Sequence, residues 1–300
     1  MKKISYVLRI FISAVIVVGV FLYMFDHNNA PLKAGKQKSV LAAVAGEGTK
    51  DSPYLIDNAE QFADFRDAVN SGRSFANCYF LQTADLDLQS YSPWIPIGEY
   101  QTNELFEGVY DGGGHVIKNL YIDGTNCKSQ YVGLFGLLKG TVMNLGIESG
   151  LVKGICIGGI TSHGVAGYAK IINCFSMADI EAVRRGGGLA DDLNGIIINS
   201  WFAGEIRGAK EFKGGIASAR VAAVYSCFSN TKIYGKDIQD KIVDSETLPR
   251  EIIFSEVFAQ KLNNAINNNV NDVFFLLKVD IGSDDLIKWK FKDGKICYDL

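Results

Sequence analysis

The sequence predicts an all-β protein, a right-handed parallel β-helix with a capping helix before it, a small α/β cap after it and a membrane anchor at the N-terminus. Three observations support this prediction. Of 32 glycines, 24 lie between Gly108 and Gly235. No proline occurs between Pro96 and Pro249. Within the same stretch, short apolar segments recur at steps of 25, 29, 26 and 27 residues, which is typical of a solenoid.

Each repeat unit contains two such segments. One carries an Asn or Ser, as in VIKNLYI, VMNLGI, IINCFS, IINSWF and VYSCFS. These five align Asn119, Asn144, Asn173, Asn199 and Ser226 in one column. The other is a Gly-apolar segment that precedes it, as in YVGLFG, IGGI, GGGL and KGGI. Two Ile-, Val- and Phe-rich segments per unit, without helical periodicity, indicate the coil of a β-helix.

The Asn column has a physical reason in such a coil. Successive coils stack at roughly 4.8 Å, so a side-chain amide at a tight corner can satisfy the turn backbone and bond the amides above and below it. Phe175, Trp201 and Phe228 follow this column two residues on and would stack as an aromatic ladder. The column is therefore expected to be structural.

The segments flanking the repeat predict its caps. A helix is expected over 58 to 71, with Asp57 or Asn58 as its N-cap and Gly72 as its stop. We expect it to cover the first coil. After the repeat, a helix over 255 to 265 and two short strands, VFFLLKV and LIKWKF, form a tail that we expect to cap the other end.

The N-terminus predicts a membrane anchor. Residues 4 to 25 carry one charge, Arg9, and as a helix would extend roughly 33 Å, enough to cross a bilayer core of about 30 Å. The candidate cleavage site Ala43-Val44-Ala45 ends 20 residues beyond Phe25, which favours an uncleaved signal anchor. We expect a single-pass cell-membrane protein with an extracytoplasmic globular part, or a secreted protein if the segment is cleaved.

The predicted organisation is an anchor over 1 to 25, a linker over 26 to 50, a β-helix over 51 to 235 and a C-terminal cap over 236 to 300. The net charge is −3, from 30 basic and 33 acidic side chains. This charge excludes the basic surface typical of a nucleic-acid-binding protein, so no nucleic-acid partner is expected.

Several stretches resemble bacterial surface proteins with GLUG-motif repeats, a pectate-lyase-like β-helix family. They are GTKDSPYLIDNAEQFADFRDAVNSG, ADLDL, PWIPIG, FEGVYDGGGHVIKNLYID and YVGLFG, and the later GGI and GGL units with IINCFS and IINSWF. The tail, SEVFAQKLNNA with Trp289 and CYDL, is similar to the family's short cap. The Gly-Gly-Leu-Val-Gly core is degenerate, since Gly159-Ile160-Thr161-Ser162 lacks the later Gly. The resemblance implies a surface scaffold rather than an activity.

Aligning the coils places His163 beside Asp192, with Asp191 and Arg220 one residue to either side of the column. A groove with these four side chains could bind a sugar or, through acid and base roles, cleave a polysaccharide. Adjacent strand residues point to opposite faces, however, so Asp191 and Asp192 cooperate only in a turn. We therefore take the four as candidate ligand-binding residues and expect no catalytic residue.

Other chemistries find little support in the sequence. Arg184 and Arg185 could serve a lyase, but no Asp cluster for calcium stacks beside them. No His-Glu-x-x-His or C-x-x-C motif occurs, and neither a metal nor a cofactor is expected. Cys174 and Cys227 share a column two coils apart, roughly 9.6 Å, which is too far for a disulfide.

These observations predict a non-catalytic β-helix scaffold at the cell surface, for binding or adhesion, with an extracellular glycan or protein as its partner. The alternative is a polysaccharide-cleaving enzyme, either a lyase or a glycoside hydrolase, of the pectate-lyase-like class.

Overall fold

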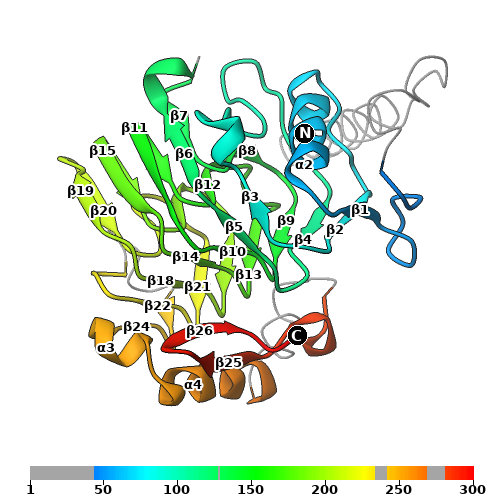
Figure 1. Cartoon of the computed structure of the whole chain (residues 1–300). Helices are drawn as coiled ribbons and strands as arrows, with labels where there is room; N and C mark the ends of the chain where they lie inside the picture. The colour runs from blue at the N-terminus through cyan, green and yellow to red at the C-terminus, as the bar shows by residue number, and fades with distance from the viewer. Residues whose placement is uncertain (1–43, 128, 234–241, 269–280) are drawn as a thin grey trace, which may run out of the picture. The chain divides into compact units, whose positions relative to one another are not determined.

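The computed structural model describes residues 44–127, 129–233, 242–268 and 281–300, which wind into a parallel β-solenoid (Figure 1). The predicted anchor over 1 to 25 and the predicted strand VFFLLKV lie outside these residues, as does most of the linker. Within the described ranges, no helix is both long and apolar enough to cross a membrane.

Two long sheets run along the solenoid, and neighbouring strands within each are parallel. In spatial order, the first contains β1 (Tyr54–Ile56), β2 (Tyr79–Gln82), β4 (Val109–Asp111), β9 (Thr141–Met143), β13 (Lys170–Ile172), β17 (Ile196–Ile198), β21 (Ala223–Tyr225) and β23 (Ile242–Val243). The second contains β3 (Leu86–Asp87), β5 (Val116–Lys118), β10 (Gly146–Ile147), β14 (Phe175–Ser176), β18 (Trp201–Phe202), β22 (Phe228–Ser229) and β24 (Glu246–Thr247).

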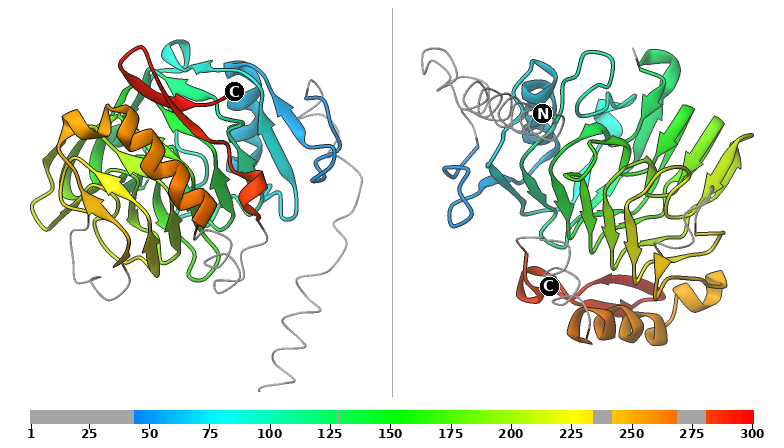
Figure 2. Two further views of the ribbon diagram at one scale, coloured as in Figure 1. Left: turned by 90° about the horizontal axis from the view of Figure 1, so that it is seen from below. Right: turned by 180° about the vertical axis from the view of Figure 1, so that it is seen from behind.

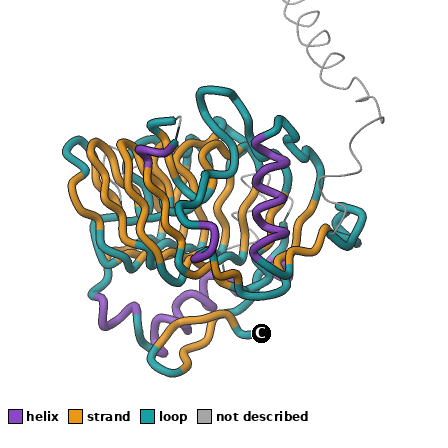
Figure 3. Tube along the Cα trace, turned by 45° about the horizontal axis from the view of Figure 1, so that its top comes forward, coloured by secondary structure: helices purple, strands orange, loops and turns teal. Residues whose placement is uncertain are grey.

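Two further sheets complete the coils. One contains β6 (Leu120–Asp123), β11 (Gly150–Gly158), β15 (Asp179–Gly187) and β19 (Ile206–Gly208), with β7 (Tyr131–Val132) and β20 (Phe212–Gly214) at its sides. The other contains β8 (Phe135–Leu138), β12 (Thr161–Gly164) and β16 (Ala190–Asp192). The chain from β9 to β12 therefore passes once through all four sheets before β13 stacks on β9. Figure 3 shows the strands of successive coils stacked side by side.

The Gly segments of the repeat lie where the chain passes from β11 to β12 and from β15 to β16. A β-carbon on Gly187 would lie 1.6 Å from the carbonyl oxygen of Ala190, and one on Gly158 would lie 2.0 Å from that of Thr161. Such contacts are sterically impossible, so glycine is required for the close turn.

The Asn column lies at the corner after β9, β13, β17 and β21 of the first long sheet. Asn144, Asn173, Asn199 and Ser226 all have left-handed backbone there, with φ of 48°, 55°, 46° and 50°. The Asn173 side-chain amide donates to Asn144 Oδ1, and that of Asn199 donates to Asn173 Oδ1, each at 2.8 Å. Asp244, with φ of 49°, continues the column after β23 and was missed by the sequence alignment.

Asn119 does not belong to this column, which corrects the sequence alignment. It follows β5 in the second long sheet, whereas Asn144 follows β9 in the first. Its amide donates to Asp87 Oδ1 at 2.9 Å, and its backbone N–H donates to Ser149 Oγ at 3.0 Å. Both corners need left-handed backbone, here with φ of 57°, so similar sequences occur at two different corners.

The predicted first helix is α2 (Ala59–Asn70), and Asn58 is its N-cap, accepting from the Gln61 N–H at 2.9 Å. Its apolar stripe, including Phe62 and Phe65, is fully buried against aromatic rings of the first coils. Figures 1 and 2 show α2 at the first end of the solenoid. The helix thus supplies the apolar cover that an open coil end needs.

The C-terminal tail differs from the prediction in its position. It contains α3 (Arg250–Ile253), α4 (Glu256–Asn268) and an antiparallel hairpin of β25 (Trp289–Lys292) and β26 (Lys295–Tyr298). These elements lie along the side of the solenoid (Figures 1 and 2). They share an apolar cluster with residues of the two long sheets, namely Met143, Ile172, Phe175, Ile198, Trp201 and Phe228. The tail therefore covers a flank that spans several coils.

The aromatic and Asn columns explain why the tail docks on this flank. Phe175 and Trp201 stack with ring centroids 4.6 Å apart, and both contact Trp289 of the hairpin. The Trp289 indole N–H donates to Asn173 Oδ1 at 2.7 Å, and the Tyr298 hydroxyl donates to the Asn173 carbonyl at 2.6 Å. Aromatic rings on the outside of the coil are thereby removed from water.

Asn173 offers a direct test of the column. We expect Asn173→Leu to lower the free energy of unfolding by about 1 to 3 kcal/mol, because buried partners in two coils and the tail lose their hydrogen bonds. Asn119→Leu is the matched control, since it places Leu at nearly the same φ but at an exposed corner. Equal losses for the two variants in chemical denaturation would show that only backbone strain matters.

Candidate functional site

The sheet of β8, β12 and β16 brings the candidate residues together. His163 pairs in register with Leu137 on one side and with Asp192 on the other. Ala190 pairs with Ala217 of the next coil in parallel, so Ala219, two residues after Ala217, lies beside Asp192, two residues after Ala190. His163 and Asp192 are therefore neighbours on consecutive coils, and Arg220 follows on the next.

Asp192 and Arg220 form a bidentate ion pair. The Arg220 Nε and Nη2 lie 2.9 and 2.6 Å from the two carboxylate oxygens, and the Asn194 amide donates to the same carboxylate at 3.0 Å. The side chain of Asp192 is 3% exposed and that of Arg220 is 69% exposed. Arg220 and Asn194 thus hold the buried carboxylate of Asp192, while most of the Arg220 side chain stays exposed to solvent.

Asp191 is turned away from Asp192 and is completely buried. Its carboxylate accepts a hydrogen bond from Arg185 Nη2 at 2.8 Å and another from the Ser218 hydroxyl. Burial raises the pKa of Asp191 to about 6, although Ser218 and Arg185 act in the opposite direction. The two adjacent carboxylates thus belong to separate ion pairs, as expected for neighbours on one strand.

His163 lies against two tyrosines. Its ring centroid is 4.5 Å from that of Tyr100 and 5.5 Å from that of Tyr131, and the two tyrosine rings are 4.9 Å apart. Burial lowers the pKa of His163. Its Nδ1 is buried and has no hydrogen-bond partner among the described residues. We call Tyr100, Tyr131 and His163 the aromatic cluster.

The sequence analysis missed both tyrosines, although one signal was available. Tyr131 is the first residue of the segment YVGLFG. In the structure it pairs in register with Cys156 of the next coil, and Cys156 pairs with Arg185 of the coil after that. The Gly segments thus place Tyr131 inside the second repeat column, where their alignment sets it opposite Gly186, one residue from its actual partner. Only the fold shows that the Arg185 guanidinium lies 5.8 Å from the Tyr131 ring. Tyr100 lies in a loop outside the repeat, and its proximity follows only from the fold.

A cleft of about 290 Å³ adjoins the aromatic cluster, since Tyr131 is one of the residues that line it. Its lining includes the apolar side chains of Ile95 and Pro96 and the carboxylates of Glu99 and Glu104. Ile95 is 54% exposed and Tyr100 is 44% exposed, so large apolar surfaces reach solvent beside the cleft. The cleft extends the accessible surface of the site.

This arrangement favours binding over acid–base catalysis. Hydrolysis by two carboxylates requires one of them to be available as a base or nucleophile. Asp191 is held by Arg185 and Ser218, and Asp192 by Arg220 and Asn194. What remains accessible is an aromatic surface beside a guanidinium, which can stack on an apolar face and donate hydrogen bonds.

The described residues offer no cluster of three or more His, Cys, Asp or Glu side chains that could hold a metal ion. The six cysteines are free thiols, and three of them, including Cys174 and Cys227, are buried. Burial raises the pKa of each of these two to about 12. They pack as small apolar groups in the column beside Ser200.

No protein-family model matches the chain. The chain is 30% identical over 164 residues to a protein of Evansella cellulosilytica with the provisional name Gly-rich membrane protein, a match that covers 53% of this chain and 16% of that protein. It is 31% identical over 175 residues to halomucin of Haloquadratum walsbyi, covering 54% of this chain and 2% of halomucin. The matched region is therefore a small part of both relatives.

The fold is similar to the crystal structure of a Bacteroides ovatus protein described provisionally as an immunoglobulin A1 protease. The TM-score is 0.51 at 18% identity, with 85% of this chain and 94% of that chain covered. At this identity the similarity concerns the fold alone. It supports the parallel β-solenoid as the class of structure.

The buried Asp191 predicts a pH dependence of stability. A carboxyl group whose pKa rises on folding contributes stability that is fully present below its ordinary pKa of 3.8 and is lost as pH rises through about 6. We expect this contribution to fall by roughly 2 kcal/mol between pH 4 and pH 7. In denaturant titrations across this range, Asp191→Asn should remove that slope, whereas Asp299→Asn at an exposed position should keep it. A slope unchanged by Asp191→Asn would assign it to other groups.

Proposed function

We propose that this chain is a cell-surface scaffold that binds carbohydrate through the aromatic cluster and Arg220, without cleaving it. The observation that carries the proposal is the surface formed by exposed Tyr100 and half-buried Tyr131 next to a guanidinium fixed by Asp192. Sugar rings present apolar C–H faces edged by hydroxyl groups, so they fit an aromatic surface flanked by fixed hydrogen-bond donors.

The four residues from the sequence take different roles in this proposal. His163 and Arg220 contact the ligand, and Asp192 orients Arg220 through its bidentate ion pair. Asp191 is a buried support, since its carboxylate holds Arg185, which lies over Tyr131. Extended stacked strands provide a rigid base for such a site.

The proposal includes a place at the cell surface. Relatives named as a membrane protein and a halomucin support membrane or surface association. The apolar segment over 4 to 25 would serve as an uncleaved, single-pass anchor, with residues 26 to 50 as a linker. The Gly segments at 158 and 187 would be degenerate GLUG repeats of a right-handed β-helix.

The binding surface can be tested by a glycan array, followed by affinity measurement on the purified full chain. We expect Tyr131→Ala to weaken binding of the best glycan at least tenfold, through lost stacking, and Arg220→Gln to weaken it about fivefold to tenfold. Phe291→Ala removes an exposed aromatic ring from the tail hairpin and should leave affinity unchanged.

The same preparation tests the enzymatic alternative. Reducing-sugar and unsaturated-product assays on the glycans that bind should show no turnover. Turnover that Asp192→Ala abolishes would replace the scaffold proposal with a polysaccharide-cleaving enzyme.

The anchor can be tested separately by mass spectrometry of the native protein from membranes. We expect peptides from the segment over 4 to 25 to be retained, because the candidate cleavage site lies far from the apolar run. A mature N-terminus at Gly46 would instead identify a secreted protein.

A further inference from the structure

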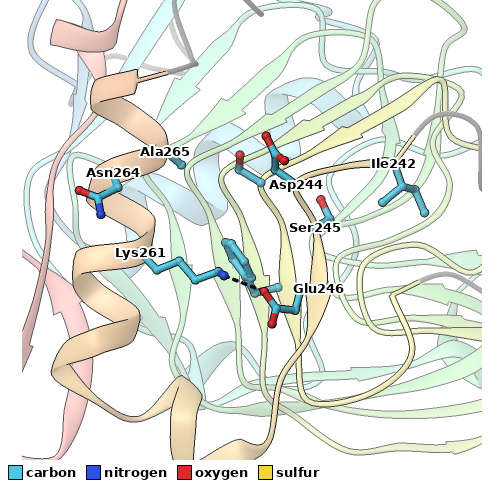
Figure 4. A pocket seen from close by; sticks show the side chains of 9 residues that line it. Ile242, Asp244, Ser245, Glu246, Lys261, Asn264 and Ala265 are labelled. Atoms are coloured by element: carbon cyan, nitrogen blue, oxygen red, sulfur yellow. Dashed lines mark hydrogen bonds and ion pairs between the residues drawn. The ribbon is translucent and has the colours of Figure 1, made fainter.

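A cavity of about 460 Å³ lies between α4 and the last corner of the solenoid, away from the aromatic cluster (Figure 4). Ser226 and Asp244 line it from the corner, Phe228 and Glu246 from the strands, and Lys261 and Ala265 from α4. Ser226 and Asp244 are the last two positions of the Asn column.

The column changes its chemistry at this cavity. Each side-chain oxygen accepts a hydrogen bond from the amide of the next coil, first Asn144 from Asn173 and then Asn173 from Asn199. The next position holds Ser226, which has no side-chain amide. Asn199 is completely buried, and its Oδ1 has no hydrogen-bond partner among the described residues. By the direction of the column, this oxygen faces the Ser226 position and lies behind the residues that line the cavity, whereas Ser226 itself lines it and is only 7% exposed.

The cavity wall is rich in acceptors. In the described part of the chain, the Asp244 carboxylate and the Ser226 hydroxyl form no side-chain hydrogen bond or ion pair. Glu246 is neutralised by Lys261, whose Nζ lies 2.7 Å from Glu246 Oε2 and 5.2 Å from the Phe228 ring, as Figure 4 shows for the ion pair. Two carboxylates and one ammonium group leave a formal charge of −1 on this wall.

We propose that this cavity binds a ligand through a primary ammonium group. An ammonium group supplies three donors and no acceptor, which matches the two carboxylate oxygens of Asp244 and the hydroxyl oxygen of Ser226 on the cavity wall. Its charge balances Asp244, and the rest of the ligand packs on Phe228 and Ala265. An amino sugar and an aliphatic diamine share this chemistry, and the site is independent of the proposed glycan surface.

Titration calorimetry on the purified full chain tests the proposal with two matched pairs of probes. Glucosamine and 1,4-diaminobutane carry the ammonium group, whereas N-acetylglucosamine and 1,4-butanediol have the same skeletons without the charge. We expect each charged probe that binds to do so at least tenfold more tightly than its neutral counterpart. Binding by glucosamine alone identifies an amino sugar, and binding by the diamine alone identifies a polyamine.

Two variants of the cavity wall and one control variant locate the binding. Asp244→Asn should weaken it at least tenfold through loss of charge, and Glu256→Gln, an exposed change on α4, should have no effect. Ser226→Asn supplies the missing amide to Asn199 at a φ that Asn tolerates, so it should abolish binding and raise the melting temperature. Equal binding of neutral probes, no binding of either charged probe, or full affinity in Asp244→Asn would overturn the proposal.

Discussion

The left-handed corner after β9, β13, β17, β21 and β23 of the first long sheet is the constraint on which the rest of the structure depends. Each of these coils must turn there within one residue, and a residue with φ near 50° is strained unless its side chain compensates. Asn meets this need because its short amide tolerates the conformation and bonds the amides of adjacent coils. The corner therefore turns the chain and fixes the coil-to-coil register, which positions every other column in the protein.

The same column explains the position of the tail. Asn144 and Asn173 use their remaining capacity to bind the tail, through the backbone of Asp285 and Ile287 and the indole N–H of Trp289. Beside them, the aromatic column would expose large rings if the flank were open. The tail therefore covers this flank of the coils, and its loss would expose the Asn column and the aromatic column together. Where the column changes to Ser226 and Asp244, α4 replaces the hairpin as the cover, and the cavity appears.

The candidate site shows how a regular scaffold can hold irregular chemistry. Register places His163 beside Asp192, while strand alternation sends Asp191 to a different environment with Arg185 and Ser218. One carboxylate thus orients an exposed guanidinium, and the other neutralises a buried one that lies over the Tyr131 ring. Because both carboxylates are held by cations, the site presents fixed donors and aromatic faces, which suits recognition better than proton transfer.

The sequence by itself determined the solenoid, the Gly turns, α2 with its Asn58 cap and the neighbourhood of His163, Asp192 and Arg220. The repeated features can be located from their spacing in the sequence. The Gly turns and the Asn58 cap can be located because they depend on the backbone conformation of a few neighbouring residues. Only the tertiary structure decided that Asn119 occupies another corner, since two corners with the same backbone requirement select the same residues. It also decided that Tyr100 joins the site and that the tail covers a flank, because such contacts join segments that share no period, and no local pattern records which surfaces meet.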